Sequence, residues 1–183
     1  MVSEERPLNP FEKESPEPRD FTDSRLVALL AHWRELAARA GLGGLPVVHA
    51  LDPVPLQFIL GWLMIMEPLE GGADFRYRLY GTEIAATTGR DLTGCKVSDS
   101  FPQFAAWTSR VYRDVMARKR PMLTRHSPQR YVPVHQWERL ILPFADGSGR
   151  VARLLVGAVV MKKLEALDEV RLPWPLREDG GAA

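Results

Sequence analysis

The sequence predicts an α+β fold built on an antiparallel sheet. The first observation is the order of the periodic segments: one amphipathic helix, two strands, two further helices and then three strands, instead of a regular alternation of strand and helix. The second is the segment 146–149, Asp-Gly-Ser-Gly, which joins the last two strands as a tight hairpin turn. At 183 residues, the chain has the length of one domain with extensions.

The first predicted element is a helix over residues 24–40. Its apolar residues recur at spacings of three and four, which places them on one face, and Gly41 follows its end. No second helix follows immediately to cover this face, so it must pack on a sheet or on another chain. We expect it to be the dimer or partner helix, through Leu26, Leu29, Leu30, Trp33 and Leu36.

The remaining elements follow in order. An apolar run over 60–66 and an alternating run over 75–80, separated by proline and glycine, predict a β-hairpin. Thr82 is placed to cap a short helix that Gly89 ends, and a longer helix is expected over 102–119. Three strands over 122–126, 135–144 and 151–161 complete the predicted domain.

The charge is unevenly distributed along the chain. The formal net charge is only +1, yet residues 24–163 carry nineteen basic and eleven acidic residues, a net +8 between two acidic ends. Residues 1–22 are rich in proline and charge, and we expect them to form a disordered acidic tail. The domain is expected over 23–163, with a flexible tail over 164–183.

The strongest basic feature lies on the long helix and the strand after it. It is either a patch for an acidic protein partner or a solvated helix face whose cations suit the helix C-terminus. Nucleic acid is a weaker expectation, because no nucleic-acid-binding motif accompanies the charge. The residues are Arg110, Arg113, Arg118, Lys119, Arg120, Arg125 and Arg130.

Two blocks of sequence resemble a known family. Residues 77–84 read YRLYGTEI and residues 89–94 read GRDLTG, and both resemble short, largely stand-alone bacterial PAS-domain proteins. Trp33 in the first helix and the stretch WERLILPF at 137–144 agree with that subgroup. The resemblance covers residues 23–161.

The resemblance implies a five-stranded antiparallel sheet of order 2-1-5-4-3, with helices on one face and an N-terminal amphipathic helix. It also implies a non-catalytic sensory or adaptor module in the cytoplasm. Such a module would bind a small ligand, a protein partner or both, and would signal through the N-terminal helix as a homodimer.

A set of mainly aromatic and sulfur-containing residues could line a pocket for a small apolar ligand, or could simply fill the core. Among the polar residues of the fourth expected strand, His135, Glu138 and Arg139 are candidates to face this interior, and strand alternation alone does not decide between them. The pocket candidates are Trp62, Met64, Phe75, Tyr77, Trp107, Tyr112, His135 and Leu142.

The sequence gives little support for a metal or a cofactor. The histidines lack metal-binding spacing. His49 and His126 are the only candidates for haem, and Cys95 lacks the neighbours of a flavin-binding motif. We therefore expect neither. An enzymatic alternative, an isomerase- or dehydratase-like cavity enzyme, would use Glu138, His135 or Tyr77 as its acid or base.

The lone Cys95 fits a reducing compartment, and the first residues do not form a signal peptide. The longest apolar run is too short to span a bilayer. We therefore expect a cytoplasmic location without membrane contact.

Overall fold

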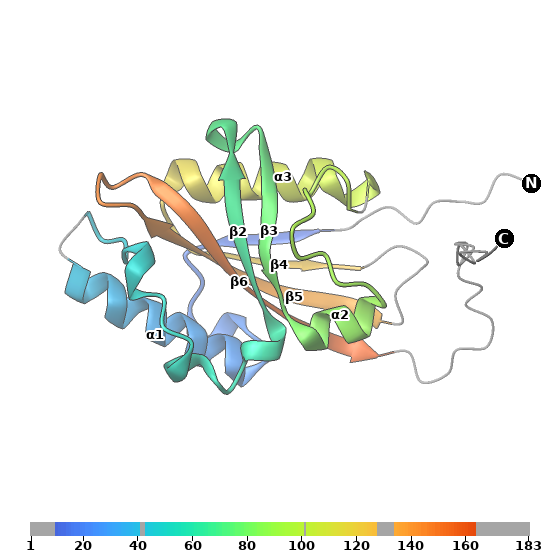
Figure 1. The fold of residues 1–183 in the computed structure, drawn as a ribbon. Helices are drawn as coiled ribbons and strands as arrows, with labels where there is room; N and C mark the ends of the chain where they lie inside the picture. The colour runs from blue at the N-terminus through green and yellow to red at the C-terminus, as the bar shows by residue number, and fades with distance from the viewer. Residues whose placement is uncertain (1–9, 41–42, 101, 128–133, 164–183) are drawn as a thin grey trace, which may run out of the picture.

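The computed structural model describes residues 10–40, 43–100, 102–127 and 134–163. They form one antiparallel sheet with a long helix on each of its two faces, α1 on one and α3 on the other (Figure 1). The predicted α+β class is therefore confirmed. The bounds are β1 (Phe11–Glu14), α1 (Ser24–Ala40), β2 (Leu63–Leu69), β3 (Asp74–Tyr80), α2 (Thr82–Thr88), α3 (Pro102–Arg118), β4 (Met122–His126), β5 (Val134–Ala145) and β6 (Val151–Lys163).

The sheet has six strands in the order β1-β4-β5-β6-β2-β3. The five strands expected from the sequence take the predicted order, and β1 is added at one edge beside β4. Strands β5 and β6 form the long central hairpin, and β2 pairs with β6 to join the first hairpin to the last one. Because β5 and β6 are central, their side chains are covered on both faces.

Strand β1 corrects the expectation that residues 1–22 are all a disordered tail. Residues Phe11–Glu14 pair with β4, and Phe11 lies opposite Arg125. The far edge of β4 would otherwise present unpaired backbone groups, which a short strand satisfies. The local composition does not reveal this pairing, because its partner strand lies more than a hundred residues later in the chain.

Two local details also differ from the predictions. The chain forms a short 3₁₀ turn over Leu60–Trp62 before β2 begins at Leu63. Thr82 is the first residue of α2, and Gly81 is the N-cap. A side chain at position 81 would place its Cβ 2.2 Å from the carbonyl oxygen of Gly61, so only glycine fits where β3 passes into α2.

Helix α1 packs its apolar stripe directly on the sheet of its own chain. Leu26 and Leu29 are fully buried, and a Cβ at Gly157 of β6 would lie 2.7 Å from each of them. The indole Nε1 of Trp33 donates a buried hydrogen bond of 2.9 Å to the carbonyl oxygen of Pro143. Of the two coverings considered for this stripe, the sheet is the one found. Four of the five residues expected to contact a second chain are therefore buried within their own chain, namely Leu26, Leu29, Leu30 and Trp33, and Leu36 is partly buried.

Candidate functional site

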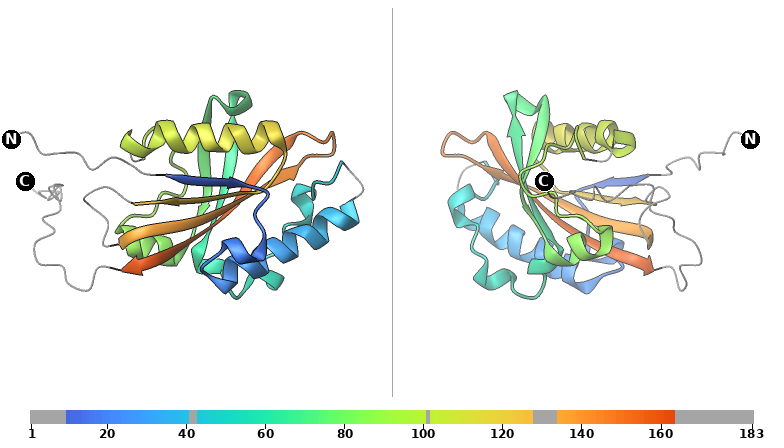
Figure 2. Two further views of the ribbon diagram at one scale, coloured as in Figure 1. Left: turned by 180° about the vertical axis from the view of Figure 1, so that it is seen from behind. Right: turned by 45° about the vertical axis from the view of Figure 1, so that its right-hand side comes forward.

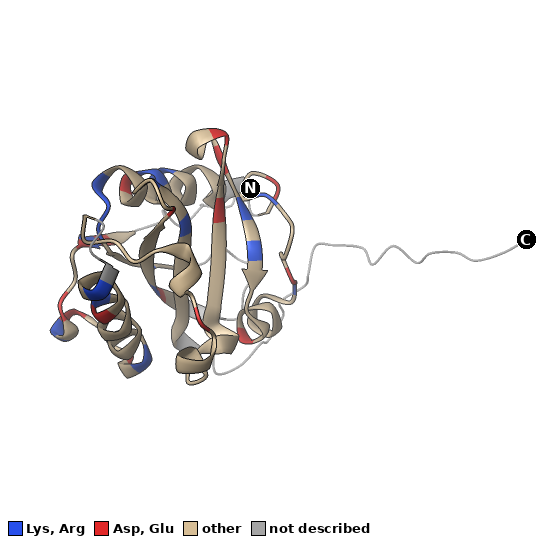
Figure 3. Ribbon diagram, turned by 60° about the vertical axis from the view of Figure 1, so that its left-hand side comes forward, with Lys and Arg blue, Asp and Glu red and all other residues tan. Residues whose placement is uncertain are grey.

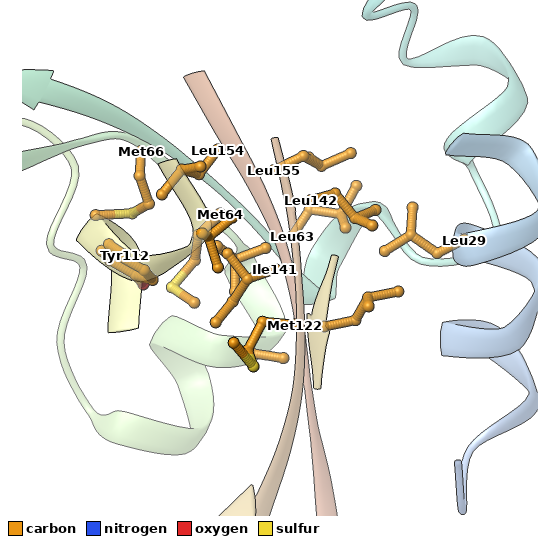
Figure 4. Packing of buried hydrophobic residues seen from close by; sticks show 14 of the residues in the cluster. Leu29, Leu63, Met64, Met66, Tyr112, Met122, Ile141, Leu142, Leu154 and Leu155 are labelled. Atoms are coloured by element: carbon orange, nitrogen blue, oxygen red, sulfur yellow. The ribbon is translucent and has the colours of Figure 1, made fainter. Parts of the chain in front are cut away.

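The side chains of β5 alternate between the two helices. Ile141 faces α3, on the same side as Tyr112, whereas Leu142 faces Leu29 of α1 (Figure 4). Arg139 lies two residues before Ile141 and therefore points to the same face of the sheet. Its Cζ lies 4.9 Å from the ring centre of Trp107 on α3. Arg139 is therefore the charged residue of β5 that points into the interior between α3 and the sheet.

Arg139 is buried with few polar contacts. Arg139 is 7% exposed, and its Nε donates a long hydrogen bond of 3.3 Å to Oγ1 of Thr124 on the neighbouring strand. The guanidinium stacks over the indole of Trp107. Within the described residues, its Nη2 has no hydrogen-bond partner. The N–H groups of a buried guanidinium normally all donate hydrogen bonds, so Arg139 still has a donor available for another acceptor.

His126 and Tyr112 are also buried on this side of the sheet. The His126 ring lies 4.7 Å from the Phe104 ring and 5.2 Å from the Trp107 ring, and its Nδ1 has no partner among the described residues. Burial, reinforced by the charge of Arg139, holds the pKa of His126 well below its usual range, so the ring is neutral at neutral pH. Tyr112 is fully buried, and its hydroxyl likewise finds no partner in the part of the chain that the structure describes.

These residues form what we call the polar centre: Trp107, Tyr112, Thr124, His126 and Arg139. Burial raises the pKa of Tyr112, and Arg139 opposes this effect through its charge. Burial raises the pKa values of Tyr77 and Tyr80 as well, and the charge of Arg139 opposes this effect at both hydroxyls. The polar centre therefore offers one permanent cation, a phenol hydroxyl and a neutral imidazole, and it contains no carboxylate.

Glu138 lies on the opposite face and does not belong to the polar centre. It is fully buried and accepts hydrogen bonds from the Nη2 of Arg125 at 2.8 Å and from the hydroxyl of Thr22 at 2.9 Å. The backbone N–H of Thr22 donates to the same carboxylate. Glu138 thus fixes the segment that leads into α1. Of the alternatives that the sequence left open for the charged residue of β5 that faces the α3-side interior, Glu138 is therefore not the one found there.

The structure brings together only part of the expected pocket. Met64, Phe75, Tyr77 and Tyr112 are buried, and the rings of Phe75 and Tyr112 meet edge to face at 5.1 Å. Leu142 faces α1 instead (Figure 4). The remaining three candidates are Trp107, half-buried beside Arg139; Trp62, at the start of β2 between Trp137 and Arg25; and His135, whose side chain lies outside the described part of the chain.

The basic residues of α3 are largely paired with the acidic residues of β1. Glu12 bonds to Arg110 and also accepts a 2.7 Å hydrogen bond from the Trp107 indole. Glu14 pairs with Arg118 at 2.6 Å and with Arg120 at 3.6 Å. Figure 2 shows β1 beside β4 with α3 above it, and both charge signs are distributed over the ribbon in Figure 3.

The other members of the expected basic patch are also engaged or lie elsewhere. Arg113 approaches the carbonyl oxygen of Gly72, and the Lys119 ammonium donates to the carbonyl oxygen of Gly149 at 2.9 Å. Arg125 is on the α1 face with Glu138. Arg130 falls outside the described residues. The expected patch is therefore not one continuous cationic surface in the described part of the chain.

An open groove of about 480 Å³ lies at the far end of α3, beside the β5–β6 turn. Its cations are occupied: Arg150 pairs with Asp146, and Arg153 pairs with Glu67 at 3.0 Å. None of its lining residues carries a buried polar atom without a partner. The groove therefore lacks the feature that distinguishes the polar centre.

The described residues contain no group of three or more His, Cys, Asp or Glu side chains placed to hold a metal ion. No helix among them has the length and apolar character to cross a membrane.

Comparison with known proteins identifies the family. A family model described as a PAS domain matches residues 21–160. The chain belongs to the PAS domain family. The match confirms the resemblance in the sequence, and β1 lies before the matched region. PAS domains are commonly sensory modules and typically non-catalytic.

Among solved structures, a match is described as an RNA-binding Light-Oxygen-Voltage receptor, with 12% sequence identity and a TM-score of 0.44. The match covers 85% of this chain and spans only 39% of the receptor chain. A search of curated proteins found no match.

Proposed function

We propose that this PAS domain is a sensory module that binds a small ligand at the polar centre and transmits its occupancy to the start of α1. One observation carries the proposal: three buried polar atoms, Tyr112 Oη, His126 Nδ1 and Arg139 Nη2, have no hydrogen-bond partner among the described residues. Leaving such groups unsatisfied costs about 1–3 kcal/mol each. A site kept for a ligand explains why the chain retains them.

The connection to α1 runs through β5. Arg139 belongs to the polar centre, and the adjacent Glu138 holds Thr22 on the opposite face. Thr22 immediately precedes Asp23, whose carbonyl oxygen accepts hydrogen bonds from the first turn of α1. A small shift of β5 caused by a ligand at Arg139 therefore acts directly on the contact that anchors the helix.

The direct test is a set of amide NMR spectra of the full chain titrated with four small probes. Benzoate, hexanoate, benzyl alcohol and hexan-1-ol provide two body shapes, each with and without a charge. We expect at least one probe at millimolar concentration to shift the amide signals of Tyr112, His126 and Arg139 in a saturable way. The signals of Arg76 and Gly147, which lie on β3 and in the β5–β6 turn, serve as controls and should stay unchanged.

A matched pair of variants locates the binding. Tyr112→Phe removes the hydroxyl without a partner, whereas Tyr80→Phe removes one that lies 3.4 Å from the hydroxyl of Thr88. Weaker probe binding in Tyr112→Phe than in Tyr80→Phe supports the proposal. If none of the four probes shifts the three interior signals, the polar centre is not a ligand site and the proposal is wrong.

A further inference from the structure

Resting on the proposed function, we infer that the ligand of the polar centre is a small organic carboxylate carrying one negative charge and an apolar body. The inference starts from the electrostatics of Arg139. It is the only buried Arg or Lys in the described part of the chain. Taking an unpaired cation out of water is costly, and proteins normally offset the cost with a carboxylate or several hydrogen bonds.

Arg125 shows how this chain satisfies a partly buried arginine when the role is structural. It lies one strand away, opposite Glu138, and donates to that carboxylate from Nε at 2.9 Å and from Nη2 at 2.8 Å. Arg139 has only the 3.3 Å contact with Thr124 and the face of Trp107. Arg125 has a carboxylate partner and Arg139 has none among the described residues. A bound ligand would supply the missing carboxylate.

Glu12 is a described carboxylate on which the charge of Arg139 acts, and it is engaged elsewhere. The charge of Arg139 reaches Glu12 only as the weakest of the named influences on that carboxylate. Glu12 bonds to Arg110 and to the Trp107 indole, and it has no hydrogen bond with Arg139 among the described contacts.

The neighbours of Arg139 define the rest of the ligand. A guanidinium presents parallel N–H groups that match the two oxygens of a carboxylate. The Tyr112 hydroxyl and the His126 ring add two neutral polar groups. Apolar residues adjoin these groups: the Phe75 ring contacts the Tyr112 ring, and Ala158 of β6 lies opposite Arg139. One cation among apolar walls balances one negative charge, which favours a monocarboxylate over a phosphate dianion.

The competing occupant is water. A buried water molecule satisfies two to four polar groups in many proteins, and it requires no charge on the occupant. The two cases differ in their dependence on ligand charge. The experiment is therefore a comparison of matched probes: benzoate against benzyl alcohol, and hexanoate against hexan-1-ol, titrated into the full chain by calorimetry and amide NMR.

We expect each carboxylate to bind at least about tenfold more tightly than its alcohol, since hydrogen bonds to charged groups contribute more than neutral ones. Arg139→Gln should remove this preference while keeping a polar side chain beside Thr124. Arg139→Lys should retain part of it, because it keeps the charge and loses the planar fork. The control is Lys96→Gln, a change at an exposed cation before α3, which should leave the preference intact.

The outcomes separate the two proposals. If alcohols and carboxylates bind equally at the interior signals, or if Arg139→Gln keeps the preference for carboxylates, the ligand class is wrong and the ligand site stands. If no probe of either kind shifts the signals of Tyr112, His126 and Arg139, the centre holds water only and both proposals are overturned. Folding of each variant is checked by its dispersed amide spectrum, and Arg139→Lys keeps the test valid if Arg139→Gln does not fold.

Discussion

Glu138 and Arg139 are consecutive residues of β5 that point to opposite faces of the sheet and differ in how their charges are satisfied. The Glu138 carboxylate accepts hydrogen bonds from Arg125 and Thr22, whereas Nη2 of Arg139 has no partner among the described residues. The Glu138 carboxylate therefore stabilises the fold, whereas Nη2 of Arg139 is available to a ligand. This pair links the polar centre to the start of α1 through a single peptide unit.

Glu138→Gln should lower the free energy of unfolding by about 3 kcal/mol, because it leaves Arg125 partly buried without its counter-charge. Urea denaturation measures the loss. Arg125→Gln breaks the same contact, so the double variant should lose much less than the sum of the two single losses. Additive losses would show that the two side chains are not coupled.

In the absence of ligand, Arg139→Met should change the free energy of unfolding in the opposite direction to Glu138→Gln. Removing an unpaired buried cation in favour of an apolar side chain of similar length is expected to raise the free energy of unfolding by about 1 kcal/mol. Arg125→Met is the matched control and should be destabilising. A clear loss of stability in Arg139→Met, measured by the same denaturation, would mean that Arg139 is satisfied within the protein.

His126 gives the unliganded protein a defined pH dependence. Its pKa is held low in the folded state, so below about pH 6.5 the unfolded chain binds a proton that the folded chain does not. Stability from this group is therefore full above that pH and falls as the pH falls. Between about pH 7 and about pH 5.5 the loss should be about 1 kcal/mol.

The window in which His126 is tested lies above the range in which most carboxylates titrate. His126→Phe should be less sensitive to pH across it by that amount, as measured by denaturation at each pH. Equal slopes in the wild type and the variant would show that the pKa of His126 is the same in the folded and unfolded protein.

The acidic residues of β1 are expected to mask the cations of α3. Hydrogen bonds from Arg110 and Trp107 lower the pKa of Glu12 despite an opposing effect of its burial. The double variant Glu12→Gln, Glu14→Gln should bind poly-L-glutamate more tightly, with an affinity that falls as salt is added. Glu35→Gln, which removes an exposed acid from α1, is the control. Unchanged binding in the double variant would show that these pairs do not shield the helix.

The elements of the fold were predictable because their signals are local. The three-and-four spacing set the bounds of α1 at residues 24–40, and the glycine-rich turn placed β5 and β6 together. Strand β1 was not predictable, since its stability comes from the free edge of β4 and from arginines of α3. The local sequence around Phe11 and Glu12 does not distinguish a free tail from an edge strand.

The polar centre was only partly predictable, for a physical reason. Strand β5 is covered on both faces, so its apolar residues occupy both faces and give no alternation from which to assign Glu138 and Arg139 to a side. Tyr112 and Leu142 were both expected at one pocket, and they lie on opposite faces of the sheet (Figure 4). The two charged residues inside the stretch 137–144 were the available signal, and the register of the sheet was needed to interpret it.

The most direct test is hydrogen exchange across the start of α1 with and without benzoate. The account predicts that benzoate changes the exchange rates of the Thr22 amide, which bonds to Glu138, and of the Leu26 amide in the first turn. Arg139→Gln should abolish the change, and benzyl alcohol should produce a smaller one. Saturable benzoate binding at Arg139 with unchanged exchange at Thr22 and Leu26 would contradict the account.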